Sequence, residues 1–325
     1  MKVVITDFPD SMMPEHDYEK QILTRGLPGC EVAVYPYRGD KAELLRILSD
    51  AAAILTAFLP IDKEIMDAAP GLKCISLNAT GYDNVDLGEA TKRGIGVFPV
   101  GEYCTEDVAE HTIAVMLAMA KNLKHYSADI DVRHVWQFDS AEAMMRVEEM
   151  TLGIFGFGKI GRCVARKAQG LGMKVIACDP YADAGRAGEM NIPLVQADEI
   201  YANAHVISNN MKQNETNVKM FSASAFKKMR QRPIFINMGR GASVVEEDLV
   251  TALDTGSIRG AALDVLADET PNLKDHPLAK RENVIITPHA AFYTTTSIIR
   301  LQEISCKNIV YYMKGELDKV FKLVN

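Results

Sequence analysis

Three residues of different chemical type, Arg240, Glu269 and His289, each follow a short apolar segment of the chain. Arg240 follows FINMG, Glu269 lies shortly after LDV, and His289 follows IITP. An imidazole can give or take a proton near neutral pH, a guanidinium can bind a carboxylate, and an acid can hold the imidazole in its protonated form. Together they could reduce a ketone that carries a carboxylate, provided that a hydride donor binds beside them.

Each of the three also has an ordinary structural explanation when it is taken alone. A histidine after a strand is more often a structural hydrogen-bonding group. Glu269 can be a solvated loop acid, and Arg240 can lie on the surface or pair with an acid. The joint pattern favours the catalytic interpretation, because ligands of parallel α/β sheets bind at the carboxyl ends of the strands.

The segment 151–180, TLGIFGFGKIGRCVARKAQGLGMKVIACDP, indicates a site for a dinucleotide. Gly156, Gly158 and Gly161 have the spacing G-x-G-x-x-G between an apolar strand and a segment of helical length. The first glycine permits a tight turn, the second lets a pyrophosphate approach the backbone, and the third lets the helix pack against the strand. Asp179, 18 residues after Gly161, can accept hydrogen bonds from the adenosine ribose and would repel a 2′-phosphate, which favours NAD. The alternative is a glycine-rich turn in some other α/β protein.

The composition is that of a globular protein of about two domains. The chain has 325 residues, of which 48% are apolar and 24% charged, and its net charge of −7 argues against nucleic acid or an anionic membrane as a partner. The apolar runs are shorter than the roughly 18 residues that span a bilayer. The cysteines form no C-x-x-C pair and no zinc-like cluster with histidine, so we expect free thiols, no metal and a cytoplasmic location.

From Met1 to about Val100, short apolar strands alternate with amphipathic segments that end at Asp, Pro or Gly. The expected strands are Val3–Thr6, Glu31–Tyr35, Ala52–Ala57, Cys74–Asn78 and Val97–Val100. Helices are expected over 41–49 and 63–69. This alternation predicts a parallel sheet covered by helices on both faces, and the absence of G-x-G-x-x-G indicates that the dinucleotide binds elsewhere.

The alternation restarts at Thr151 and continues almost to the end of the chain. The expected strands are Leu152–Phe155, Lys174–Asp179, Pro193–Val195, His205–Ser208, Ile234–Met238, Ala261–Val265 and Val284–Thr287. Before them, the apolar segment 107–121 predicts a buried interdomain helix, and the polar stretch 122–150 is expected to cross between the domains. A last helix from about Thr294 is expected to return to the first domain.

Several motifs together resemble the D-isomer-specific 2-hydroxyacid dehydrogenase family. They are GFGKIG with CDP, INMGRGASVVEEDLV, AALDVLADETP and VIITPHAAFYT, with NATGYDNVDL in the first half of the chain. The spacing from Asp264 to Glu269 fits the D-x-x-x-x-E pattern of the family. TPHAAFYT and YCTEDVAEH are most similar to the D-lactate dehydrogenase branch. The resemblance covers essentially the whole chain.

The resemblance implies an α/β fold with two doubly wound parallel-sheet domains. A flavodoxin-like substrate domain would comprise residues 1–101 and 292–325, and a Rossmann NAD-binding domain would comprise residues 102–291. His289 would be the acid/base with Glu269 as its carboxylate partner, and Arg240 would bind the carboxylate of the substrate. An ionised Glu269 would favour the imidazolium form of His289 by charge pairing.

The resemblance also implies contacts to substrate and cofactor. The backbone N–H groups of Gly81 and Tyr82 would hold the substrate carboxylate, and Tyr103 would reach the substrate. Asp264 matches the residue that orients the nicotinamide carboxamide. The remaining expected contacts to NAD are made, in addition to the three glycines, Asp179 and Arg240, by Thr105, Lys159, Ile160, Met211, Asn217, Met238 and Gly239.

The segment VISNNMKQNETN departs from the family pattern. Asn209, Asn210, Met211 and Lys212 stand where the family usually has Leu-His followed by Val, Leu or Cys and then Pro. Lys212 could tolerate additional negative charge near the cofactor, which counts against a strict preference for NAD.

The loop TAFLPID stands where phosphoglycerate dehydrogenases carry a more polar segment. Phe58 and Leu59 would offer apolar contact to the substrate, as would Phe292. The expected reaction is therefore NAD-dependent reduction of a 2-oxo acid to a D-2-hydroxy acid, with a substrate of the D-lactate/pyruvate type. Within the class, hydroxypyruvate/glycerate and longer or aromatic 2-oxo acids are the alternatives.

Two other classes of function share parts of this pattern. An NAD(H)-sensing corepressor of the C-terminal-binding-protein type has the same fold and triad, but the chain lacks long disordered or basic tails. A Rossmann methyltransferase would leave the His/Arg/Glu set unexplained. The family is typically dimeric through its dinucleotide domains, so we expect a homodimer, and the helix over 107–121 could contribute to the interface.

Overall fold

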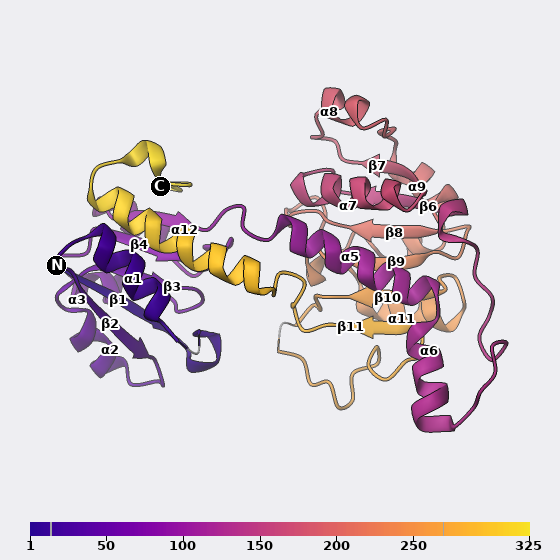
Figure 1. Ribbon diagram of the computed structural model, residues 1–325, viewed down its shortest axis with the longest axis horizontal. Coiled ribbons are helices and arrows are strands. Elements are labelled where there is room, and N and C mark those ends of the chain that lie inside the picture. The colour runs from indigo at the N-terminus through magenta and orange to yellow at the C-terminus, as the bar shows by residue number, and fades with distance from the viewer. Residues whose placement is uncertain (14, 269) are drawn as a thin grey trace. The chain divides into compact units, whose positions relative to one another are not determined.

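The computed structural model describes residues 1–13, 15–268 and 270–325. The chain divides into two compact units, one comprising Met1–Tyr103 with Thr294–Asn325 and the other Cys104–Tyr293 (Figure 1). The chain therefore passes from the first unit to the second after Tyr103 and returns after Tyr293, whereas the sequence predicts boundaries after 101 and 291.

The first unit is built on a parallel sheet of five strands in the order β2-β1-β3-β4-β5. The strands are β1 (Lys2–Asp7), β2 (Glu31–Pro36), β3 (Ala51–Thr56), β4 (Cys74–Leu77) and β5 (Gly96–Pro99). All pairs run parallel. This is the strand order of flavodoxin-like sheets. In such sheets the strands before and after the point between β1 and β3 are added in opposite directions across the sheet. The prediction of a flavodoxin-like first domain is confirmed.

Helices cover both faces of this sheet. They are α1 (Asp17–Gly26), α2 (Lys41–Leu48), α3 (Lys63–Ala68), α4 (Leu87–Lys92) and α12 (Thr295–Met313). Side chains of α1 and α12 share one apolar cluster with Val3, Ile5 and Leu55, and those of α2, α3 and α4 share another with Val4 and Ile54. Because successive strand residues point to opposite faces, both faces of the sheet are buried.

The second unit contains a parallel sheet of six strands in the order β11-β10-β9-β8-β6-β7. The strands are β6 (Thr151–Phe155), β7 (Lys174–Cys178), β8 (Val206–Asn209), β9 (Ile234–Asn237), β10 (Gly260–Leu263) and β11 (Val284–Ile286). The expected strand Pro193–Val195 is wrong, because only a parallel bridge between Ala177 and Leu194 forms there. Pro193 has no N–H to donate to a ladder. With this bridge beyond β7, the sheet has the Rossmann order around β6.

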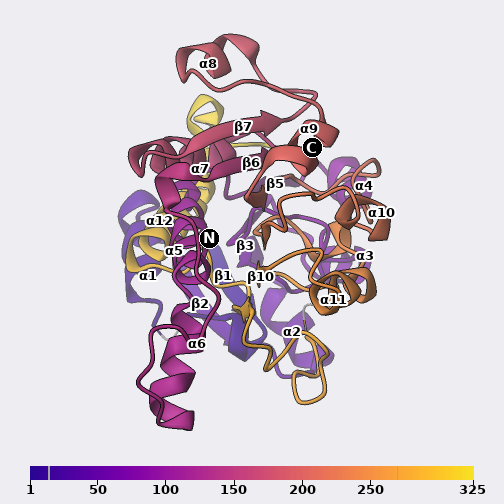
Figure 2. The same ribbon diagram turned by 90° about the vertical axis from the view of Figure 1, so that its right-hand side faces the viewer.

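Helices also cover both faces of the second sheet. They are α5 (Thr105–Ala120), α7 (Lys159–Gly170), α8 (Ala184–Glu189), α9 (Ala197–Asn203), α10 (Ala223–Phe226) and α11 (Glu246–Asp254). Figure 2 shows α5 and α7 on one side of the strands and α10 and α11 on the other. Two separate clusters of buried apolar residues confirm this division.

Two expectations about the connecting segments are corrected. The apolar helix, α5, lies wholly in the second unit, where it packs on α7, β9 and β10. The stretch 122–150 also belongs to the second unit and does not cross between units. It forms α6 (Leu123–Ala128), a π-helical turn over Asp129–Arg133 and an extended return to β6. Both errors have one cause: the chain passes between the units at a short bend over residues 102–104, which composition does not mark.

Three further observations concern thiols, metals and membranes. The cysteines are all free, as predicted. The described residues contain no group of three or more His, Cys, Asp or Glu side chains that could hold a metal ion. Within residues 1–13, 15–268 and 270–325, every helix is too short or too polar to cross a membrane.

Candidate functional site

The predicted cofactor and catalytic residues of the second unit gather at the carboxyl edge of its sheet. Because all six strands are parallel, the loops that follow them emerge at this one edge. The loops carry Gly156 after β6, Asp179 after β7, Met211 after β8, Met238, Gly239 and Arg240 after β9, Asp264 after β10, and His289 after β11.

Close backbone approaches join these loops. A Cβ on Gly156 would lie 2.8 Å from the Met211 nitrogen, and one on Gly239 would lie 2.9 Å from the Met211 oxygen. A Cβ on Gly241 would lie 1.9 Å from the carbonyl oxygen of Leu266. Real Cβ atoms do not approach so closely, so these positions require glycine. The loops after β6, β8, β9 and β10 therefore form one continuous surface.

The three glycines of the G-x-G-x-x-G motif have the different environments that the motif predicts. Gly156 has a φ of +85°, which favours glycine, and a Cβ on Gly161 would lie 2.1 Å from the Gly156 oxygen. Gly158 is the N-cap of α7, and a Cβ there would meet nothing within 4 Å. The space above Gly158 and the N-terminus of α7 thus suits a pyrophosphate, because free helical N–H groups attract anions.

Asp179 is fixed beside this loop. Its Oδ2 accepts a hydrogen bond from the Phe157 N–H (2.8 Å), and its Oδ1 accepts one from the Tyr181 N–H (2.8 Å). A carboxylate can accept further hydrogen bonds, so Asp179 remains able to bind ribose hydroxyls. The residues present therefore fit a dinucleotide.

The turn that carries His289 is held by Asp264. Asp264 Oδ1 accepts hydrogen bonds from the Thr287 hydroxyl (2.5 Å) and the Ala290 N–H (2.8 Å), and Oδ2 accepts one from the Ala291 N–H (3.0 Å). The Asp264 carbonyl accepts a further bond from the His289 N–H (2.8 Å). His289 itself has a φ of +51°, an uncommon conformation that these bonds maintain. Asp264 is 3% exposed, so its contact with nicotinamide remains a prediction.

His111 on α5 extends this network, which the sequence did not predict. Its Nε2 lies 3.1 Å from the Thr287 hydroxyl oxygen. Since the single hydroxyl hydrogen of Thr287 is donated to Asp264, Thr287 can only accept from His111. His111 therefore carries a hydrogen on Nε2, an assignment that follows from the hydrogen-bond network.

Arg240 lies at the start of a short 3₁₀ turn with its side chain exposed. Its Nη1 donates to the Gly239 carbonyl (2.8 Å), and its own carbonyl accepts from Asn237 Nδ2 (3.1 Å) and Ser243 Oγ (2.7 Å). The guanidinium group is therefore presented from a backbone that is fixed on both sides. This suits the binding of an anionic substrate group.

Other predicted cofactor residues differ in what they can offer. Asn217 is 5% exposed, and its side chain bonds the Lys212 carbonyl and the Asn214 N–H within its own loop. Met238 is also buried, whereas Met211 and Ile160 are half-buried and Lys159 is exposed. Thr105 is the first residue of α5. Asn217 therefore shapes the loop, and its contact with the cofactor remains a prediction.

His289 lines a cavity of the second unit, and its ring contacts that of Phe292. Their ring centroids are 6.4 Å apart with nearly perpendicular planes. The cavity is lined by the polar or charged residues Lys124, Asp264, Asp268, Lys280, Thr287 and His289 and by the apolar residues Leu266, Pro271, Leu273, Leu278, Ala279, Val284, Ile286 and Pro288. An apolar wall with a few convergent polar groups is typical of a small-molecule site.

The substrate residues predicted in the first unit lie at the carboxyl edge of its own sheet. Phe58, just after β3, is 60% exposed, whereas Leu59 is 2% exposed and packs in the apolar core. Of the two, Phe58 alone presents its side chain to solvent. Its loop is held by Asp7, whose Oδ2 accepts hydrogen bonds from the Phe58 N–H (2.8 Å) and the Thr56 hydroxyl (3.0 Å).

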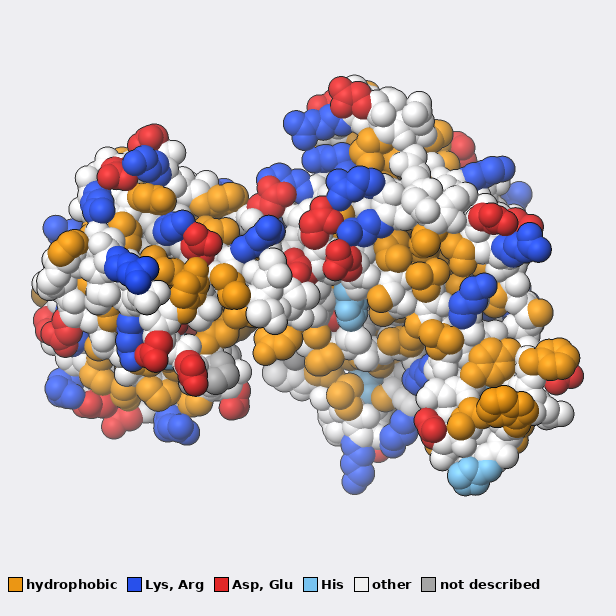
Figure 3. Space-filling view, viewed as in Figure 1, with side chains coloured by type: hydrophobic (Ala, Val, Ile, Leu, Met, Phe, Trp, Pro, Cys, Tyr) orange, Lys and Arg blue, Asp and Glu red, His pale blue; other side chains and the backbone are white. Residues whose placement is uncertain are grey.

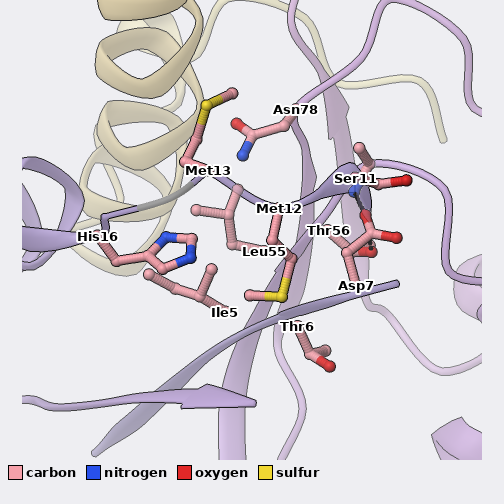
Figure 4. A pocket seen from close by; sticks show the side chains of 11 residues that line it. Ile5, Thr6, Asp7, Ser11, Met12, Met13, His16, Leu55, Thr56 and Asn78 are labelled. Carbon is pink, nitrogen blue, oxygen red and sulfur yellow. Dashed lines mark hydrogen bonds between the residues drawn. The ribbon is translucent and has the colours of Figure 1, made fainter. Parts of the chain in front are cut away.

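A small pocket occurs at the same edge. Figure 4 shows Asp7 and Thr56 together on one side of it, His16 on the other and Met12 between them. Further along the edge, Gly81 is exposed and has open space at its Cβ position except for the Asp83 carboxylate at 3.9 Å.

Of the two tyrosines of this unit that the sequence places near the substrate, Tyr82 is half-buried and Tyr103 is buried. Tyr82 packs against the apolar core, with Lys322 Nζ 5.8 Å from its ring centroid. Tyr103 is 8% exposed. The contact of Gly81 and Tyr82 with a carboxylate through their N–H groups remains a prediction.

Comparisons with known proteins agree with this geometry. Residues 113–291 match the family model of the D-isomer specific 2-hydroxyacid dehydrogenase NAD-binding domain. The chain is 33% identical over 283 residues to a glyoxylate reductase of Korarchaeum cryptofilum, covering 86% of this chain and 84% of that protein. The chain belongs to the D-isomer-specific 2-hydroxyacid dehydrogenase family.

Two other relatives show how broad this dehydrogenase family is. The chain is 36% identical over 274 residues to the chloroplastic D-3-phosphoglycerate dehydrogenase 2 of Arabidopsis thaliana, covering 84% of this chain but 43% of that longer protein. The structure of a D-lactate dehydrogenase from Aquifex aeolicus, complexed with NAD and lactic acid, superposes with a TM-score of 0.83. It shares 28% identity and covers 98% of this chain and 97% of its own. The cofactor of the family is NAD.

One predicted residue of the dehydrogenase site is not described by the structure, and four residues near the site had no role predicted from the sequence. Glu269, predicted as the carboxylate partner of His289, lies outside the described residues. Asp7, His111 and the buried pair Asn209 and Ser243 were not given roles from the sequence. Asp7 could have been found as an acid directly after the first predicted strand. Asn209 was marked only by its departure from the family pattern.

Proposed function

We propose that the chain uses NADH to reduce a 2-oxo acid to a D-2-hydroxy acid, in a reversible reaction with substrates of the D-lactate/pyruvate type. The observation that supports this most strongly is the placement of Arg240 and His289 at the carboxyl edge of the sheet that also carries the glycine loop and Asp179. The second unit would be the dinucleotide domain and the first the substrate domain.

Two side chains of the second unit would perform the binding and proton transfer. The exposed guanidinium of Arg240 would bind the substrate carboxylate and polarise the adjacent carbonyl. His289, on its strained turn beside Phe292, would give its proton to the carbonyl oxygen. NADH, when bound, supplies the hydride to the carbonyl carbon. In the reverse direction, His289 would take the proton from the hydroxyl group.

The remaining roles follow from the resemblance. Glu269 would hold His289 in its protonated form, and Asp264 would fix the turn that carries His289. The N–H groups of Gly81 and Tyr82 would bind the substrate carboxylate from the first unit. Tyr103 would contact the substrate through the limited surface that it exposes.

The substrate side chain is proposed to be short or apolar. Phe58 presents an apolar ring, 60% exposed, on a loop that Asp7 holds at the edge of the first sheet. A phosphorylated substrate would instead need a cation at such a position. Hydroxypyruvate, which has a short polar side chain, and longer 2-oxo acids are the alternatives.

Oxidation of NADH, followed by its absorbance, tests this function across a panel of 2-oxo acids. The panel contains pyruvate, hydroxypyruvate, glyoxylate, phenylpyruvate and 3-phosphohydroxypyruvate, with NADPH as the cofactor control. We expect the highest kcat/KM with pyruvate and NADH. Preference for NADPH would point to Lys212 as the residue that outweighs Asp179. Tight NADH binding without turnover of any 2-oxo acid would favour the NAD(H)-sensing alternative.

A homodimer is also proposed, through the segment that follows α5. Figure 3 shows apolar side chains gathered over α6 and the residues after it. Trp136 and Phe138 are 91% and 90% exposed, and Val132 is 73% exposed. Monomers rarely expose large contiguous apolar patches, and aromatic residues are enriched at interfaces. Light scattering of Trp136→Glu should give a monomer where the wild type is a dimer, and a monomeric wild type would contradict the proposal.

The free thiols support a cytoplasmic location, because reducing compartments keep cysteines unpaired. Fractionation of cells that express the untagged protein would test it. Recovery in a membrane or extracellular fraction would contradict it.

A further inference from the structure

A buried polar cluster joins the ends of β8 and β9. Its members are Asn209, Asn237 and Ser243, which are 0%, 1% and 2% exposed. Asn209 Nδ2 donates to Asn237 Oδ1 (2.9 Å) and to Ser243 Oγ (2.9 Å). Buried polar groups are costly unless they are hydrogen-bonded, so this cluster needs each of its members.

The cluster converges on the backbone carbonyl of Arg240. Asn237 Nδ2 donates to it at 3.1 Å, and Ser243 Oγ donates to it at 2.7 Å. Because the one hydroxyl hydrogen of Ser243 is used in this way, its oxygen must accept from Asn209. Asn237 Oδ1 also accepts from the Gly239 N–H (3.1 Å), so the backbone is held on both sides of Arg240.

Asn209 also fixes the loop after β8. Its Oδ1 accepts a hydrogen bond from the Met211 N–H (3.1 Å). The family usually has leucine at this position, and a leucine side chain would supply none of the three hydrogen bonds that Asn209 makes. In this chain, one amide therefore ties the loop after β8 to the loop of Arg240.

We propose that Asn209 is a positioning residue for Arg240. It acts through Asn237 and Ser243 on the Arg240 backbone, and the bond from Nη1 to the Gly239 carbonyl then sets the direction of the guanidinium. The proposal deepens the proposed function, because it takes Arg240 to bind the substrate carboxylate. Its effect should therefore fall on 2-oxo acid binding more than on cofactor binding.

Asn209→Leu is the primary test, with KM for the 2-oxo acid, kcat, Kd for NADH and Tm measured on the full chain. Loss of the buried hydrogen bonds should raise KM about tenfold, with little change in the Kd for NADH. The glycine loop and Asp179, which are not altered, maintain the cofactor affinity. A KM equal to that of the wild type would overturn the proposal.

Two further variants separate positioning from general destabilisation. Ser243→Ala removes the donor to the Arg240 carbonyl and should raise KM in the same way. The KM of the double variant, Asn209→Leu with Ser243→Ala, should be no higher than that of the more impaired single variant, because both substitutions act through one network. Asn308→Leu, at a 1% exposed asparagine of α12 in the first unit, is the matched control. It should lower Tm without raising KM.

Hydrogen exchange distinguishes failure of this proposal from failure of the proposed function. If the wild type reduces no 2-oxo acid, the proposed function fails and the exchange of amides 237–243 decides the proposal instead. Faster exchange there in Asn209→Leu, but not in Asn308→Leu, supports it. Unchanged exchange in this segment overturns it, as would additive effects in the double variant.

Discussion

The two sheets differ in what occupies their carboxyl edge at the point where the strand order reverses. In the first unit, β1 ends in Asp7, which is 3% exposed and accepts hydrogen bonds from the N–H groups of Phe8 and Phe58 and from the hydroxyl of Thr56. In the second unit, β6 leads into Gly156 and Gly158, and the position above Gly158 is open. The Asp7 carboxylate occupies this position in the first unit, whereas in the second unit the position is open and lies beside the N-terminus of α7.

We propose that this difference gives two sheets of similar topology different roles. A buried acid at the reversal point repels a phosphate and fixes the loop of Phe58, so the first unit is suited to present a side chain. Glycines at the same point leave room for a pyrophosphate and expose helical N–H groups. The fold is shared, and the function depends on the residues at this edge.

The largest expected effect is at the edge of the second sheet. His289→Ala should lower kcat by about 10²–10⁴-fold, because general acid catalysis is lost, while the Kd for NADH is unchanged. Stopped-flow kinetics and NADH fluorescence titration measure the two quantities. Turnover like that of the wild type would remove His289 from the mechanism.

His205→Ala is the matched control for this variant. His205 precedes β8 at the amino edge of the same sheet, where its Nδ1 accepts a hydrogen bond from the Thr151 N–H (3.0 Å). Its loss should lower Tm and leave kcat unchanged, because ligands bind at the carboxyl edge. Equal losses of kcat in both variants would indicate a purely structural effect.

Gly158→Ala and Gly161→Ala compare an open with a filled position in one loop. Alanine at Gly158 meets no atom within 4 Å, so Tm should be unchanged, whereas Kd for NADH should rise about tenfold or more because the pyrophosphate must approach here. Alanine at Gly161 would lie 2.1 Å from the Gly156 oxygen and should lower both Tm and NADH affinity. Unchanged NADH binding by Gly158→Ala would show that the pyrophosphate does not lie on this loop.

Asp7→Asn tests the filled edge of the first unit. The amide NH₂ would face the donors that the carboxylate now accepts from, so the free energy of unfolding should fall by about 2 kcal/mol. NADH affinity should be unchanged. Denaturant unfolding measures the first quantity, and the exposed Asp50→Asn, which loses only a surface pair with Lys2, is the control. Equal stability of the two variants would contradict the role of Asp7.

The smallest expected effect concerns the pairing of α5 with α7 in the second unit. Hydrogen bonds from Cys163, Lys167 and Arg166 lower the pKa of Glu106 to about 2. A lowered pKa stabilises the fold above the ordinary value of 4.5 and loses this effect as pH falls toward about 2. Glu106→Gln should therefore lower Tm at neutral pH. The loss in free energy of unfolding should be less than about 1 kcal/mol, because Glu106 is half-exposed. Near pH 2, where the wild-type carboxylate becomes protonated, the Tm of the variant should approach that of the wild type.

The first unit supplies the control for this pH dependence. There α1 packs on α12 through apolar contact, and the approach is so close that a Cβ added at Gly26 would lie 2.5 Å from a methyl group of Val310. Val310→Ala should lower Tm by the same amount across this pH range. A pH-independent deficit in Glu106→Gln as well would contradict the assignment.

The sequence predicts the fold and the glycine loop because their signals are local. Strand and helix periodicity, and the spacing from Gly156 to Asp179, lie within single βαβ units. The expected strand over 193–195 failed because proline reduces it to one bridge. Nor does the sequence separate Phe58 from Leu59, because two neighbouring apolar residues leave open which one points inward.

The positioning residues could not be predicted in this way. Asn209 finds its partners 28 and 34 residues away, Asp7 binds Thr56 49 residues away, and His111 meets Thr287 176 residues away. Only the folded sheets bring such pairs together. A departure from the family pattern marks Asn209 in the sequence. Its hydrogen bonds to Asn237 and Ser243, which indicate its role, are formed only in the folded protein.

The configuration of the product tests the central claim most directly. Chiral chromatography of the hydroxy acid formed from NADH and pyruvate, or from the 2-oxo acid with a chiral hydroxy acid product that is reduced fastest, should show the D-isomer alone. Under the same conditions His289→Ala should form this product about 10²–10⁴-fold more slowly. An L-hydroxy acid, a racemate, or no hydroxy acid at all would contradict the account.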